Sequence, residues 1–119
     1  MDNSKYLIAV ASTDGIVVNQ HFGRADRFHI YSAEGGSFKS TGEIRKVSPV
    51  CSGGDHDEDA MLKNIRTLSD CRYVLVSRIG QRAIMLAEQN GIIPMEIPGM
   101  IEESVKKVTE FDRIQNLFK

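Results

Sequence analysis

Residues 73–97 decide the fold, and they read YVLVSRIGQRAIMLAEQNGIIPMEI. The continuously apolar run Tyr73–Val76 is typical of a strand that is buried on both faces. The next apolar residues recur at helical spacing, and Asn90-Gly91 is a common helix stop. A second run, Ile92–Ile97, is expected at a sheet edge because Pro94 cannot donate a hydrogen bond to a neighbouring strand. This strand–helix–strand order predicts parallel strands joined by a right-handed crossover.

The first half of the chain supplies three more strands and a helix. Tyr6–Ala11 is another continuously apolar run, which indicates a buried strand. Arg27–Ser32 and Ser37–Val47 are rich in β-prone residues and flank Gly35-Gly36, so they are predicted to form a hairpin. From Asp57 the apolar residues change to a helical spacing.

The apolar stripes of two helices complete the element order. The stripe of the first contains Met61, Leu62, Ile65 and Leu68. The stripe of the last contains Ile101, Val105, Val108, Phe111, Ile114 and Phe118. The order strand, hairpin, helix, strand, helix, strand, helix predicts an α/β fold with a five-stranded mixed sheet and helices on both faces. We expect one domain that covers residues 1–119.

The composition excludes several classes of protein. Hydrophobic residues make up 41% of the chain and charged residues 26%, which is typical of a globular domain. Fifteen Lys and Arg against sixteen Asp and Glu leave a net charge of −1, so we expect no nucleic-acid partner. No apolar run approaches the ~20 residues that span a bilayer, and the N-terminus has no secretory signal. The predicted location is therefore the cytoplasm, with no membrane partner.

A polar loop after the first strand, residues 19–24, carries the main ligand candidate, His21. A neutral imidazole is a common metal ligand, although a loop histidine often binds only a backbone carbonyl. We expect Phe22 to anchor the loop in the core, and Gly23 to let the backbone turn beside a bulky ligand. Ligands of such sheets gather at the carboxyl ends of the parallel strands, so this loop and the loop after Val76 are predicted to share one rim.

A second glycine-rich loop contains Cys51 and His56 at C-x4-H spacing. This is not a zinc-finger pattern, because a structural zinc site needs four ligands. Together with His21 these residues would provide three metal ligands and an open position. The alternative is a solvated loop with an ordinary thiol. Cys71 directly precedes a buried strand and is expected in the core, and we expect both thiols to be free.

Several arginines are candidates for holding an anion, and no enzyme motif accompanies them. Each could bind an anion through forked hydrogen bonds and is otherwise an ordinary surface charge; they are Arg24, Arg27, Arg78 and Arg82. Arg24 and Arg78 are the preferred pair. The chain has no nucleophile elbow, phosphate loop or dinucleotide fingerprint. The strands Tyr6–Ala11 and Tyr73–Val76 hold no acidic residue, so the carboxylate cage of a two-metal nuclease is missing. We therefore expect a protein that is not an enzyme.

Several motifs together resemble a known family. They are Ile8–Ala11, Asp14-Gly15, Asn19–Gly23, Phe28–Tyr31, Gly53-Gly54, His56-Asp57, Val74–Val76, Ile79-Gly80 and Gly91-Ile92. This set resembles the dinitrogenase iron–molybdenum cofactor-binding family, which includes NifX- and NafY-type proteins and the C-terminal domain of NifB. The His-Phe-Gly element in its strand context is the most specific of them.

The resemblance implies a ribonuclease H-like fold and a carrier for an iron–sulfur-based metallocluster, the iron–molybdenum cofactor or a precursor. The His-Phe-Gly match implies that His21 binds the cofactor, with Cys51 and His56 as auxiliary ligands. Arg24 and Arg78 would face an anionic cluster. Nitrogenase-type assembly proteins are the implied partners.

Two alternatives stay open. The first is a regulatory module of the same fold that binds a mononuclear zinc or a small anion. The second is a hydrolase descended from the same fold, which the missing carboxylates disfavour. The oligomeric state is also left open by the sequence.

Overall fold

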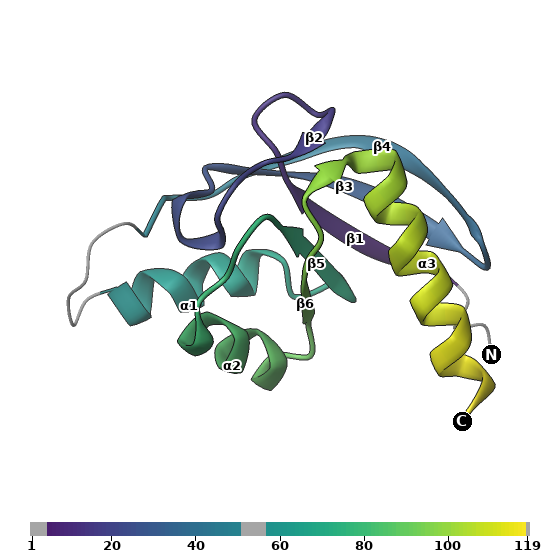
Figure 1. The fold of residues 1–119 in the computed structure, drawn as a ribbon. Coiled ribbons are helices and arrows are strands. Elements are labelled where there is room, and N and C mark those ends of the chain that lie inside the picture. Colours follow the sequence, from purple (N-terminus) through teal and green to yellow (C-terminus); the bar gives the residue numbers. More distant parts are fainter. Residues whose placement is uncertain (1–4, 51–56, 119) are drawn as a thin grey trace.

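A five-stranded mixed sheet lies at the centre of the molecule (Figure 1). The computed structural model describes residues 5–50 and 57–118. The strand order is β4 (Ser37–Lys46), β3 (Arg27–Glu34), β1 (Lys5–Ala11), β5 (Tyr73–Val76) and β6 (Ile93–Glu96). Strands β1, β5 and β6 are parallel, whereas β3 is antiparallel to β1 and β4. The predicted hairpin, parallel unit and edge position of the proline-containing strand are confirmed.

Helices cover both faces of the sheet, as the sequence predicted. Helices α1 (Asp57–Thr67) and α2 (Gln81–Gln89) pack on one face, and α3 (Ile101–Leu117) packs on the other. Alternate residues of a strand point to opposite faces. In β1 this places Ala9 and Ala11 in the core under α1 and α2, and Ile8 and Val10 in the core under α3. No helix of the described residues is long and apolar enough to span a bilayer.

Short elements shape the segment between β1 and β3. Strands β2 (Val17–Val18) and β7 (Gly99–Met100) form an antiparallel ribbon. The carboxylate of Asp14 accepts hydrogen bonds from the N–H groups of Ile16 and Val17, which hold the pKa of that carboxyl below its usual value. Gly15 adopts a φ of 76°, a backbone conformation that glycine tolerates, and the chain turns there. A 3-10 turn, η1 (Phe22–Arg24), then leads into β3.

The apolar stripe of α3 is fully buried only in its first half. Ile101, Val105 and Val108 are buried, but Phe111, Ile114 and Phe118 are 36%, 53% and 82% exposed. A helix of 17 residues is about 26 Å long, whereas the four-residue strands β5 and β6 each span about 13 Å. The ring of Phe111 still meets that of Tyr73 in β5 edge to face, with 6.2 Å between the ring centres. Beyond Phe111 the helix extends past the sheet, which leaves Ile114 and Phe118 exposed. The helix is amphipathic as predicted, and the sheet buries only the first half of its apolar stripe.

A buried carboxylate fixes α3 to the amino end of β5. Asp112 is 5% exposed and accepts hydrogen bonds from Tyr73 Oη at 2.7 Å and from Arg72 Nη1 at 2.9 Å. The guanidinium of Arg72 also lies 4.4 Å from the centre of the Tyr6 ring. Burial, and next the negative charge of Asp112, raise the pKa of Tyr6 to about 12. We call Arg72, Tyr73 and Asp112 the α3 anchor.

Candidate functional site

Backbone hydrogen bonds join the His21 loop to the loop that follows β5. The N–H of Phe22 donates to the carbonyl of Arg78 at 2.8 Å, and the N–H of Ser77 donates to the carbonyl of Gln20 at 2.9 Å. His21 and Arg78 form an isolated parallel bridge. The two loops thus continue the β1–β5 pairing beyond the ends of the strands. The structure brings them together on one rim, as predicted.

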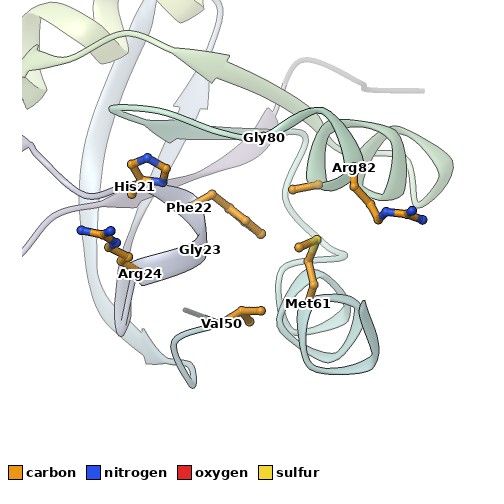
Figure 2. Close-up of a pocket in the computed structure, with 9 residues that line it drawn as sticks. His21, Phe22, Gly23, Arg24, Val50, Met61, Gly80 and Arg82 are labelled. Carbon is orange, nitrogen blue, oxygen red and sulfur yellow. The ribbon is translucent and has the colours of Figure 1, made fainter. Parts of the chain in front are cut away.

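A surface hollow of about 270 Å³ opens on this rim (Figure 2). Residues from η1, from the segment after β4, from α1 and from the start of α2 surround it. Its lining consists of His21, Phe22, Gly23, Arg24, Val50, Met61, Gly80, Arg82 and Ala83. Figure 2 shows His21 and Arg24 on the η1 side and Arg82 on the α2 side. The hollow therefore has an apolar centre and a basic edge.

Phe22 and Gly23 set the shape of η1. Phe22 is 3% exposed, and its ring centre lies 6.0 Å from that of Phe28, so the predicted anchoring of the loop is confirmed. The N–H of Val50 donates to the carbonyl of Gly23 at 2.6 Å. A Cβ added at Gly23 would lie 3.0 Å from the carbonyl oxygen of Val50. The close neighbour of Gly23 is therefore the backbone of Val50, and not a bound ligand as the sequence suggested.

The predicted basic residues have different roles in the structure. His21 and Arg24 line the hollow and are exposed, and within residues 5–50 and 57–118 neither side chain forms a hydrogen bond or ion pair. Arg78 is also exposed, but only its backbone holds the rim and its side chain is not part of the lining. Arg82 pairs with Glu58 of α1 at 3.3 Å. Arg24 is thus the arginine that lines the hollow without an acidic partner in the described chain, and its guanidinium is turned outward at the edge (Figure 2).

The auxiliary ligands predicted from the sequence, Cys51 and His56, lie outside the described residues. Val50, which directly precedes Cys51 in the chain, lines the hollow. Within the described part of the chain, no three His, Cys, Asp or Glu side chains are grouped so as to hold a metal ion. The three-ligand set proposed from the sequence therefore stays a prediction.

The remaining histidine and cysteine of the described residues have structural positions. Nε2 of His29 lies 3.2 Å from the carbonyl oxygen of Ser12, and the imidazole packs beside Gly15. Cys71 is 2% exposed, as expected for a core residue. Burial, and next the charge of Asp70, raise the pKa of its thiol to about 12. A thiol with such a pKa is a poor metal ligand at neutral pH.

Two residues at the rim were not identified from the sequence. Met61 has the helical spacing of a core residue, and it is only partly buried because it lines the hollow. Glu96, at the end of β6, accepts a hydrogen bond from the N–H of Ile79 at 2.8 Å. This bond holds the loop after β5 in place. No motif marks either residue, because each role depends on a neighbour that is distant in the sequence.

Comparison with known proteins gives the family of the chain. Residues 4–110 match the family described as dinitrogenase iron-molybdenum cofactor. The chain belongs to this family. The resemblance drawn from the His-Phe-Gly loop and its flanking motifs is thereby confirmed.

Curated relatives in this family are longer than the present chain. The chain is 36% identical over 118 residues to the FeMo cofactor biosynthesis protein NifB of Chlorobaculum tepidum, with 99% of the chain and 27% of the relative covered. It is 42% identical over 105 residues to the protein of the same name from Frankia alni, with 86% and 20% covered. The chain therefore matches about a quarter of the length of these relatives or less.

Solved structures share the fold. The crystal structure of PH0822 superimposes with a TM-score of 0.66 at 24% identity, covering 87% of this chain and 88% of that one. An NMR structure from Thermotoga gives a TM-score of 0.61 at 20% identity, with 88% of each chain covered. At these identities the likeness is one of fold.

Proposed function

We propose that this domain binds and carries an iron–sulfur-based metallocluster, the iron–molybdenum cofactor or a precursor, in the hollow beside His21. The observation that carries the proposal is an exposed imidazole without a protein partner in the described chain, at an open hollow, in a member of this family. In the proposal the domain performs no chemical step. The β4-β3-β1-β5-β6 order is compatible with the ribonuclease H-like arrangement that the resemblance implied.

Each proposed role follows from the chemistry of the side chain. An imidazole binds iron or a heterometal, and a single protein ligand leaves the cluster exchangeable. Arg24 on the edge of the hollow offsets the negative charge of a metal–sulfur cluster, and Arg78 adds positive charge to the same rim. Cys51 and His56 are proposed as auxiliary ligands. An incomplete ligand set suits a carrier, because the cargo must pass to a nitrogenase-type assembly partner.

Anaerobic titration of the purified domain with the isolated cluster tests the proposal. Cluster uptake is followed by absorption and EPR for the wild type and for His21→Ala. We expect the substitution to weaken binding at least tenfold, which corresponds to about 1.4 kcal/mol. His29→Gln is the matched control, since this imidazole is bonded to the backbone away from the hollow.

Two outcomes would contradict the proposal. Unchanged affinity in His21→Ala would remove the assigned ligand. Purified protein that contains stoichiometric zinc and takes up no cluster would instead favour the alternative of a mononuclear zinc module.

A further inference from the structure

The floor of the hollow is apolar, although its edge is basic. Phe22 from η1, Val50 after β4, Met61 from α1 and Ala83 from α2 contribute the floor. Figure 2 shows Met61 entering the hollow from α1, with Phe22 reaching toward it from η1. These residues expose carbon and one thioether sulfur. A ligand that enters the hollow therefore exchanges water for apolar and polarizable contacts.

The charge of the edge attracts any anion. The side chain of Arg24 lies on one side, and the first turn of α2 lies on the other. Gly80, the N-cap of α2, makes no side-chain capping bond, and the first N–H groups of a helix have no acceptor within it. Oxyanions and sulfide-bearing anions of equal charge would both be drawn to this edge. Discrimination between them has to come from the floor.

We infer that the floor around Met61 makes the hollow select a soft, sulfide-faced anion over a hydrated oxyanion of the same charge and shape. Oxo groups hold water by strong hydrogen bonds, which an apolar floor does not replace, so their burial is costly. Sulfide groups are large and polarizable, and they lose less on leaving water. The thioether of Met61 is the soft side chain of the floor. This inference rests on the proposed function, because the same hollow is the site.

The size of the hollow fits one face of a cluster. The hollow has a volume of about 270 Å³. Pockets that enclose a whole ligand are usually about this size or larger. A tetrahedral four-sulfide anion is thus a suitable small probe of the floor, and the exposed part of a larger cluster stays free for transfer.

Tetrathiomolybdate and molybdate form the matched pair for the test, since they are tetrahedral dianions that differ only in sulfur for oxygen. Their dissociation constants are measured anaerobically by equilibrium dialysis with molybdenum analysis. We expect the wild type to bind tetrathiomolybdate at least tenfold more tightly than molybdate. Met61→Gln, similar in length but polar, should reduce this preference to less than about threefold. Met61→Leu should give an intermediate value, because it keeps the apolar floor and lacks the sulfur.

Met85→Gln is the control, since Met85 lies on α2, is 51% exposed and is not part of the lining. It should leave the preference unchanged, and circular dichroism checks that each variant is folded. Equal affinities in the wild type, tighter binding of molybdate, no binding of either anion, or a preference that survives Met61→Gln would each overturn the inference. If tetrathiomolybdate is preferred but no metallocluster is taken up, the proposed function fails while the inference stands. If clusters bind without a sulfide preference, only the inference fails.

Discussion

At the amino end of β5, the side chains of Arg72 and Asp112 meet each other, whereas at its carboxyl end His21 and Arg24 face solvent. Both ends combine aromatic rings with basic groups. In the α3 anchor Asp112 is 5% exposed, and its carboxylate accepts hydrogen bonds from Arg72, Tyr73 and Asn116. At the hollow, His21 and Arg24 find no acidic partner in the described chain, whereas Arg82 pairs with Glu58. Similar residues thus stabilise the fold at one end and are available to a ligand at the other.

The difference has an energetic reason. A buried charge is costly unless it is paired, so the α3 anchor is stable only as a set. Exposed groups at the hollow are hydrated and add little to stability. Substitutions at the two ends should therefore separate stability from binding.

Asp112→Ala should have the largest effect. It removes the acceptor of the Tyr73 hydroxyl and the ion-pair partner of Arg72, and we expect the free energy of unfolding to fall by about 3 kcal/mol. Urea denaturation measures the change. Glu110→Ala, an exposed site on the same helix, should change stability by less than about 0.5 kcal/mol. A similar small loss in Asp112→Ala would show that the anchor does not hold α3.

Gly23→Ala should have an intermediate effect and should change both stability and cluster binding. The new Cβ would lie 3.0 Å from the backbone oxygen of Val50, so η1 or the segment after β4 must shift. We expect a loss of about 1–2 kcal/mol in stability, together with weaker cluster binding. Gly36→Ala is the control, since its Cβ would meet only the flexible side chain of Arg113. Wild-type stability and binding in Gly23→Ala would refute the close-approach role of this glycine.

The pH dependence of stability should show the smallest effect, through the buried thiol next to the α3 anchor. The pKa of Cys71 is raised from 9.0 to about 12 in the folded protein, so above pH 9 the folded state retains a proton that the unfolded state loses. Stability should therefore fall as pH rises from 9 toward 12. Between pH 8 and pH 10 this group should account for a loss of about 1 kcal/mol.

Denaturation curves at several pH values check this expectation. The range ends at pH 10 because two buried tyrosines begin to contribute there in the same direction. The pKa of Tyr6 is raised from 10.0 to about 12, and burial also raises the pKa of Tyr73. Cys71→Ala should give a flatter profile over the same range, whatever its absolute stability. An equally steep profile in that variant would assign the alkaline loss to another group.

Local pattern was sufficient for the order of the elements and for part of the site. The apolar runs and the helical stripes predicted the sheet, the hairpin and the helices on both faces, because burial has a different period in strands and in helices. His21 and Arg24 were predicted from the loop after the first strand, and both line the hollow. Cys51 and His56, which no observation of the described residues tests, stay predictions.

Pattern was insufficient where a residue's role depends on a distant neighbour. Ile114 continues the apolar stripe of α3 but is 53% exposed, because the helix runs on past Phe111, whose ring meets Tyr73 of β5. Met61 has the spacing of a core residue and instead lines an open hollow. Gly23 has no side chain, so the backbone at Val50, 27 positions later in the sequence, can lie close to it.

By itself, the sequence determined the identity and order of the five sheet strands and the three helices, since each depends on propensities and periodicities of neighbouring residues; the β2–β7 ribbon was not predicted. Tertiary structure alone decided which polar groups are paired and which remain available. Arg72 and Asp112 are 40 residues apart in the chain and meet only because α3 packs across the sheet. Within the described residues the His21 ring has no hydrogen-bond partner, and the hollow that it lines is also bordered by apolar side chains such as Phe22, Val50 and Met61.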